Sequence, residues 1–152
     1  MSTSQVTTIN LHEQLKVIGK TFIGDYSKSS QYIMEIQKEL SDAGIPFIQT
    51  KVMGVYYDNP NEKKAEELKS FQGVFVTDPN AKIPASLTQL SLKGNYLYVK
   101  ATGEIMNAIY EGYGALFIYI AEKAITLKSP AGYQVSTFEN DEMTTEIYME
   151  LN

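Results

Sequence analysis

The chain has 152 residues, a formal net charge of −5 and 43% hydrophobic residues, a composition that excludes wholesale disorder and allows one domain with a sizeable core. It contains no Cys, no Trp, no Arg and a single His, His12, which excludes disulfides, thiolate nucleophiles, zinc fingers, iron–sulfur clusters and His-rich metal sites. The negative charge and the lack of Arg also argue against nucleic-acid binding, whereas 11 tyrosines stand in excess.

The N-terminus gives no sign of a targeting or anchoring segment. It has neither the basic residues nor the apolar stretch of a secretory signal. The longest strongly apolar run, residues 115–121, is far shorter than the roughly 20 residues that cross a bilayer. We therefore expect a cytoplasmic protein that does not associate with membranes.

The first predicted elements are a strand and a helix. Residues 16–26 mix β-branched and aromatic side chains and predict a strand with a bulge near Gly19. Apolar residues from Ile33 to Ala43 recur at helical spacing and predict a helix. Gly44 supplies a left-handed stop for that helix.

Two strands follow, and the second half of the chain repeats the whole order. The strands are expected at 51–58 and 71–77, separated by a charged loop or helical turn at 61–69. The second half is expected to form a strand, a long helix and two strands at residues 87–101, 104–126, 133–138 and 144–151. The repeated order predicts an α+β fold built from a duplicated β-α-β-β unit. Its antiparallel sheet would carry both helices on one face and a concave ligand face at the seam of the two halves.

The domain boundaries follow from this duplication. Residues 1–12 are expected to form a flexible lead-in, and residues 13–152 a single domain. Its two halves would be residues 13–83 and 84–152.

Strand alternation points to a tyrosine-lined site. In the last strand, Ile147 and Met149 are expected beneath the helices, with Glu146 and Tyr148 on the open face. Cross-strand tyrosine pairs also stabilise sheets by about 0.2–1 kcal/mol without a ligand, so each tyrosine alone has a structural explanation. As a set, their rings suit a planar or cationic organic molecule. The expected ligand-binding residues are Tyr56, Tyr96, Tyr98, Gln134, Ser136, Glu146 and Tyr148.

Several motifs resemble one family. The segment 54–60, GVYYDNP, resembles the GVYYDxP signature of GyrI-like small-molecule-binding domains, which include effector-binding domains of bacterial multidrug-responsive transcription regulators. The segments 133–135 and 145–148 resemble the family's Tyr-Glu-Val strand and its closing TEIY strand. The resemblance extends over about residues 15–151 and implies an aromatic pocket for drug-like or hydrophobic cationic molecules.

The sequence departs from this resemblance at the centre of the implied pocket. The family's Glu, which pairs with the positive charge of the ligand, is replaced by Gln134. A neutral or weakly cationic aromatic ligand is therefore expected, unless Glu146 or Asp58 supplies the missing charge. The regulators carry a DNA-binding module before this domain, so we expect a standalone member.

The resemblance leaves three functions open. We expect non-enzymatic binding of a small organic molecule for sensing or sequestration, with no catalytic residues, no metal and no cofactor. One alternative is a GyrI-like hydrolase that uses Glu146 or a tyrosine. The other is a protein–protein role such as inhibition of DNA gyrase. Haem binding is not expected because His12 precedes the predicted sheet, and the oligomeric state is left open.

Overall fold

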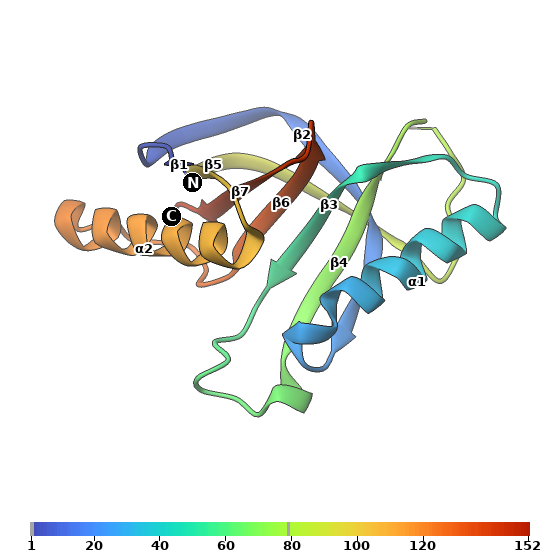
Figure 1. Cartoon of the computed structure of the whole chain (residues 1–152), viewed down its shortest axis with the longest axis horizontal. Coiled ribbons are helices and arrows are strands. Elements are labelled where there is room, and N and C mark those ends of the chain that lie inside the picture. Colours follow the sequence, from blue (N-terminus) through green and yellow to red (C-terminus); the bar gives the residue numbers. More distant parts are fainter. Residues whose placement is uncertain (1, 79) are drawn as a thin grey trace.

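The computed structural model describes residues 2–78 and 80–152, and their side chains except those of Ser2 and residues 12–16. Over these residues the chain forms seven strands and two α-helices (Figure 1). In chain order these are β1 (Ser2–Thr3), β2 (Thr7–Ile23), α1 (Ser29–Asp42), β3 (Phe47–Tyr56), β4 (Lys69–Val76), β5 (Thr88–Thr102), α2 (Ile105–Lys123), β6 (Gly132–Glu139) and β7 (Glu142–Glu150). Two short 3-10 turns, η1 (Tyr26–Lys28) and η2 (Ala65–Glu67), precede α1 and β4. The predicted α+β fold with its repeated strand–helix–strand–strand order is confirmed.

The sheet closes on itself. Its strands pair antiparallel in the order β1-β5-β2-β4-β3-β6-β7, and β5 pairs in addition with β7. Both edges of β5 (15 residues) are paired. Tyr96 and Tyr98, for example, have partners on β2 along one edge and on β7 along the other. The six strands from β2 to β7 therefore form a ring that has an inner and an outer face.

The inner face of this ring holds an apolar core. Residues of all six strands pack there in one cluster that includes Val17, Met53, Val55, Phe71, Phe75, Leu92, Tyr96, Val135 and Tyr148. Complete burial of one large apolar side chain stabilises the fold by about 1.5–3 kcal/mol. The face away from the helices, expected as a concave ligand surface, is thus mainly the packed interior of the ring.

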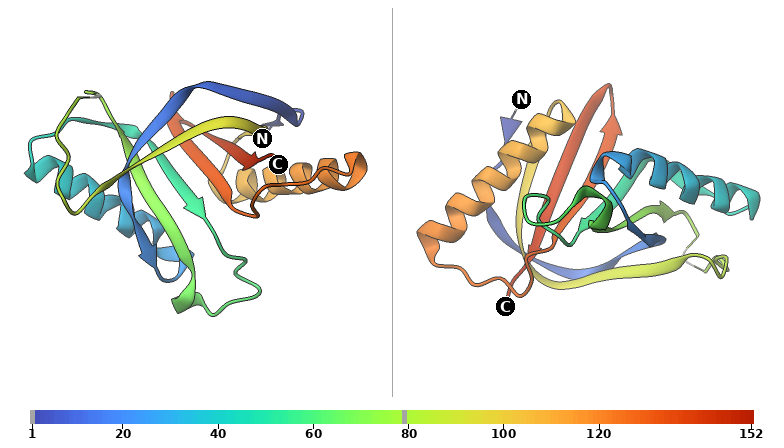
Figure 2. Two further views of the ribbon diagram at one scale, coloured as in Figure 1. Left: turned by 180° about the vertical axis from the view of Figure 1, so that it is seen from behind. Right: turned by 90° about the horizontal axis from the view of Figure 1, so that it is seen from below.

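Both helices cover the outer face. Ile36 and Leu40 of α1 are fully buried against Ile18 and Val74. Leu116 of α2 is buried in a separate cluster on β5 and β7. The two helices lie on the same side of the sheet, to either side of β3 and β6 (Figure 2). This arrangement matches the prediction of two helices on one face.

The strand predicted at residues 16–26 corresponds to β2, which is longer than predicted. It begins at Thr7, and residues 7–11 pair with β5, so the segment expected to be a lead-in belongs largely to the sheet. Residues 7–11 are mostly polar and carry no clear strand pattern. Pairing with β5, which local hydrophobicity does not reveal, holds them in the sheet. The register shift lies between Leu11 and Leu15 rather than at Gly19. Gly19 instead faces Gly73, where an added Cβ would overlap backbone atoms of β4.

The helix termini show one confirmed prediction and one further finding. Gly44 follows α1 with a left-handed φ of 73°, as predicted. Glu104 caps α2 by accepting hydrogen bonds from the backbone amides of Met106 and Asn107. Within the described residues, no helix has the length and apolar character needed to cross a membrane.

Candidate functional site

Buried polar side chains concentrate on the outer face of the central strands. Within the described residues, five uncharged polar side chains are at most 9% exposed, namely Ser70, Gln72, Gln134, Ser136 and Thr145. Gln72 and Gln134 lie to either side of Gly54 in one row across β4, β3 and β6. A buried polar group without hydrogen bonds costs several kcal/mol, so these side chains need hydrogen-bond partners on this face.

Two tyrosine rings lie over glycines of these strands. A Cβ added to Gly54 would lie 2.7 Å from the hydroxyl oxygen of Tyr56 and 2.8 Å from its ring carbon Cε2. A Cβ added to Gly132 would overlap the hydroxyl group of Tyr113, which comes from α2. Glycine within a strand often marks such a close approach. We call the outer-face side chains Ser70, Gln72, Gln134 and Ser136, with the rings of Tyr56 and Tyr113, the interhelix patch.

Hydrogen bonds tie the patch to both helices. The side-chain amide Nε2 of Gln134 donates to the Tyr113 hydroxyl oxygen at 2.9 Å. The corresponding nitrogen of Gln72 donates to the hydroxyl oxygens of Ser29 at 3.2 Å and Ser70 at 3.1 Å. Each half of the fold thus links one central glutamine to its own helix.

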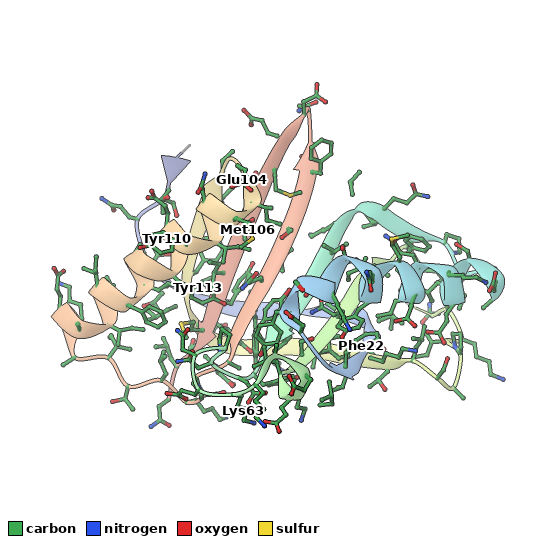
Figure 3. All side chains as sticks on the ribbon, turned by 60° about the horizontal axis from the view of Figure 1, so that its bottom comes forward. Phe22, Lys63, Glu104, Met106, Tyr110 and Tyr113 are labelled. Carbon is green, nitrogen blue, oxygen red and sulfur yellow. The ribbon has the colours of Figure 1, made fainter. Side chains whose placement is uncertain are left out.

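Aromatic side chains enclose the same region. The Tyr26 ring meets the Tyr56 ring edge-on, with ring centroids 4.8 Å apart, and the Tyr56 hydroxyl donates to Ser29 Oγ at 3.3 Å. Met106, Tyr110 and Tyr113 follow one another at helical spacing along α2 (Figure 3). Met106 and Tyr110 are 67% and 82% exposed, so α2 offers uncovered apolar surface.

The electrostatic character of the patch is neutral. Burial raises the pKa of Tyr113 to about 12, so its phenol stays protonated at physiological pH. Asp58, a candidate for the missing charge, forms an ion pair of 2.9 Å with Lys63 in the loop that lies between the helices (Figure 3). The hydrogen bond from the Lys63 ammonium in this ion pair, together with one from the Lys69 backbone amide, lowers the pKa of Asp58. The carboxylate is therefore already paired at the border of the patch.

The predicted site residues fall on two different faces. Tyr56, Gln134 and Ser136 belong to the outer patch. Tyr133 is paired with Tyr148, which lies in the inner core, so the alternate residue Gln134 points outward. The expectation that all the tyrosines share one face with Gln134 is therefore wrong. The residues that point inward are Tyr96, Tyr98, Glu146 and Tyr148.

The inner group forms its own cluster. The Tyr98 hydroxyl donates to Glu146 Oε2 at 2.6 Å, and the Tyr148 hydroxyl donates to the same oxygen at 3.4 Å. Burial, followed by interaction with Glu146, raises the pKa of both phenols. Glu146 therefore lies across the sheet from Gln134 and does not supply a charge to the patch.

Ser70, Gln72 and Tyr113 are the patch residues that were not predicted from the sequence. Tyr113 lies on a helix, whereas strand alternation predicts only residues on strands. Its signal in the sequence is weak, because Tyr110 and Tyr113 resemble an ordinary apolar helix face. Within the described residues, no group of three or more His, Cys, Asp or Glu could hold a metal ion. The His12 side chain lies outside the described residues.

Comparisons with solved structures identify the same fold elsewhere. The crystal structure of the EcmrR C-terminal domain matches with a TM-score of 0.69 and 17% identity, over 99% of this chain and 97% of that one. EcmrR in a DNA complex matches with a TM-score of 0.68 and 16% identity, over 99% of this chain but only 57% of that one. A conserved protein from Listeria innocua matches with a TM-score of 0.63 and 8% identity, over 97% and 92% of the two chains.

A comparison with curated protein sequences gives no match. The model of one protein family, described as a GyrI-like small molecule binding domain, matches residues 6–151. This range includes every element from β2 to β7 and the whole interhelix patch. The chain therefore belongs to the family of GyrI-like small-molecule-binding domains.

Proposed function

We propose that the chain binds a neutral, planar aromatic molecule at the interhelix patch and acts by sensing or sequestering it. The observation that carries the proposal is the row of buried amides, Gln72 and Gln134, beneath the rings of Tyr56 and Tyr113. Ligand sites typically combine apolar or aromatic walls with a few placed polar groups, which is the composition of this patch.

The rings define the shape of the expected ligand. The ring of Tyr56 occupies the position that a side chain at Gly54 would take, and the ring of Tyr113 does the same at Gly132. Binding of a flat molecule against the strands requires both rings to turn outward about their side-chain bonds, with loss of the hydrogen bonds of their hydroxyl groups. Offset stacking on such rings stabilises an aromatic ligand by about 0.5–1.5 kcal/mol beyond the area it buries.

The amide of Gln134 defines the polar part of the ligand. A side-chain amide has a donor and an acceptor next to each other, which matches a lactam or another cyclic amide. When Tyr113 moves aside, the Nε2 atom that now donates to it becomes available to the ligand. The expected class is therefore a planar heteroaromatic lactam or a similar molecule with an adjacent donor and acceptor.

The charge of the patch argues for a neutral ligand over a cationic one. An organic cation bound there would lose hydration without gaining a carboxylate partner, because Gln134 is uncharged, Asp58 is paired with Lys63 and Glu146 lies across the sheet. Transfer of an unpaired ion into such a site costs several kcal/mol. The hydrolase alternative that uses Glu146 loses support at this site, since that carboxylate lies on the opposite face of the sheet, and the version that uses a tyrosine stays a prediction.

The test uses a matched pair of probes, neutral quinolin-2-one and the permanent cation N-methylquinolinium. We expect quinolin-2-one to raise the melting temperature of the full chain in a concentration-dependent way, and N-methylquinolinium to raise it less. Tyr56→Leu should reduce the quinolin-2-one shift, whereas Tyr119→Leu, on α2 outside the patch, serves as the matched control. A larger shift with the cation, or equal loss in both variants, would contradict the proposal.

A further inference from the structure

A hollow opens on the inner face of the ring. It has a volume of about 280 Å³ and lies where β3 and β7 end and β6 begins. Its lining combines three tyrosines with aliphatic side chains, one carboxylate and one exposed lysine, chiefly Val55, Tyr57, Lys93, Tyr96, Tyr133 and Glu150. The volume lies just below the 300–1,000 Å³ typical of sites for drug-sized ligands, so it fits a smaller molecule.

The rings and the carboxylate face one another. The centroids of Tyr96 and Tyr133 lie 5.9 Å apart with their planes tilted by 52°, so the two rings form a corner. Glu150 is paired with Tyr96 across β5 and β7. Glu150 and Tyr133 line the same hollow, and burial, followed by the charge of Glu150, raises the pKa of Tyr133 to about 12. Aromatic faces beside a carboxylate attract organic cations.

The protein already places its own cations at the edge of this hollow. The Lys69 ammonium lies 5.0 Å from the centroid of the Tyr57 ring. The Lys128 ammonium lies 3.6 Å from Glu150 Oε2, with the lysine side chain 63% exposed and that of Glu150 24% exposed. Such a half-exposed ion pair contributes only about 0–1 kcal/mol, so Lys128 is a displaceable competitor.

We propose that this inner hollow is a second ligand site, which binds a small organic cation against the corner formed by the rings of Tyr96 and Tyr133, with Glu150 as its counter-ion. The expected ligand is a methylated or primary amine small enough for 280 Å³. The site is independent of the interhelix patch, because its side chains point to the opposite face of the sheet. The two sites differ in charge preference, since the patch is neutral and the hollow contains a carboxylate.

The test compares choline with its neutral isostere 3,3-dimethylbutan-1-ol on the full chain, with the tyrosine rings labelled with carbon-13. We expect choline to shift the ring signals of Tyr96 and Tyr133 and to bind about tenfold more tightly than the isostere. Glu150→Gln should weaken choline binding about tenfold. Glu35→Gln, an exposed position on α1, removes the same charge elsewhere and should leave the affinity unchanged.

The Lys128→Met variant separates binding at this site from general charge attraction. It removes the competitor of the ligand and should tighten choline binding two- to fivefold, an effect of about the size of one exposed ion pair. Equal affinities for choline and the isostere would overturn the proposal, as would equal effects of Glu150→Gln and Glu35→Gln. So would the absence of any saturable change up to about 10 mM choline. Failure of the quinolin-2-one test leaves these outcomes unaffected, because the two probes report on opposite faces.

Discussion

Replacement of Gln134 with Glu probes the interhelix patch by adding a charge at nearly constant size. The Gln134 side chain is only 9% exposed, and the Tyr113 hydroxyl 2.9 Å away can donate to the new carboxylate. Burial disfavours the charged form of a carboxyl and raises its pKa, and a single donor offsets only part of this effect. An upward shift of about two units is reasonable for a carboxyl at this depth.

The sign of the stability change follows from that shift. The unfolded chain ionises the new carboxyl near its ordinary pKa of about 4.3, whereas the folded chain ionises it at about 6.3. Below the lower value both states bind the proton, and the variant should be nearly as stable as the parent. Between the two values the variant loses stability as the pH rises. Above about pH 7 the loss is complete and amounts to about 2.7 kcal/mol.

Urea unfolding of the parent and the variant at pH 4 and pH 8 measures this difference. Gln89→Glu makes the same chemical change at an exposed position of β5 and should cost the same small free energy at both pH values. N-methylquinolinium should restore part of the lost stability at pH 8, because the patch then holds a counter-ion. A Gln134→Glu variant with the same relative stability at both pH values would refute the burial on which the patch rests.

Two further predictions concern the packing and the ionisation of the tyrosines. Gly132→Ala forces the Tyr113 ring off the strand and should cost about 1–3 kcal/mol in urea unfolding. Gly114→Ala, where an added Cβ meets nothing within 4 Å, should instead stabilise α2 by about 0.5–1 kcal/mol, and equal costs would contradict this packing. Tyrosines with a raised pKa stabilise the fold below pH 10, and this stabilisation is lost as the pH rises above 10. Phenolate absorbance should therefore show these side chains ionising only when the protein unfolds. Ionisation near pH 10 in the folded protein would contradict their burial. The tyrosines concerned are Tyr98, Tyr113, Tyr133 and Tyr148.

The elements that the sequence predicts well are those with strong local signals. The helix α1 follows from its apolar spacing and from Gly44, and the repeated order of elements follows from alternation and turns. Gln134 and Tyr56 are correctly predicted to share one face, and residues 54–56 pair antiparallel with residues 132–134. Local pattern and motif are sufficient for these features.

The closure of the ring could not be predicted in the same way. It depends on pairings such as that of Thr7 with Tyr98, between residues about ninety positions apart, and nothing local to either residue encodes it. Closure turns one face into an interior, which places Tyr98 and Glu146 inside and separates them from Gln134. Alternation assigns residues to one of two faces, but only the tertiary pairing decides which face is covered.

NMR titration with quinolin-2-one, followed by the side-chain amide signals of the glutamines, tests directly whether a small molecule binds on the outer patch between the helices. Gln134 and Gln72 lie in one row of the patch, whereas Gln89 is exposed on β5. Binding at the patch should give saturable shifts of the Gln134 and Gln72 amide signals at one common affinity, with the Gln89 signal unmoved. Saturable binding that leaves the Gln134 amide unchanged, while signals of the inner core move, would contradict it.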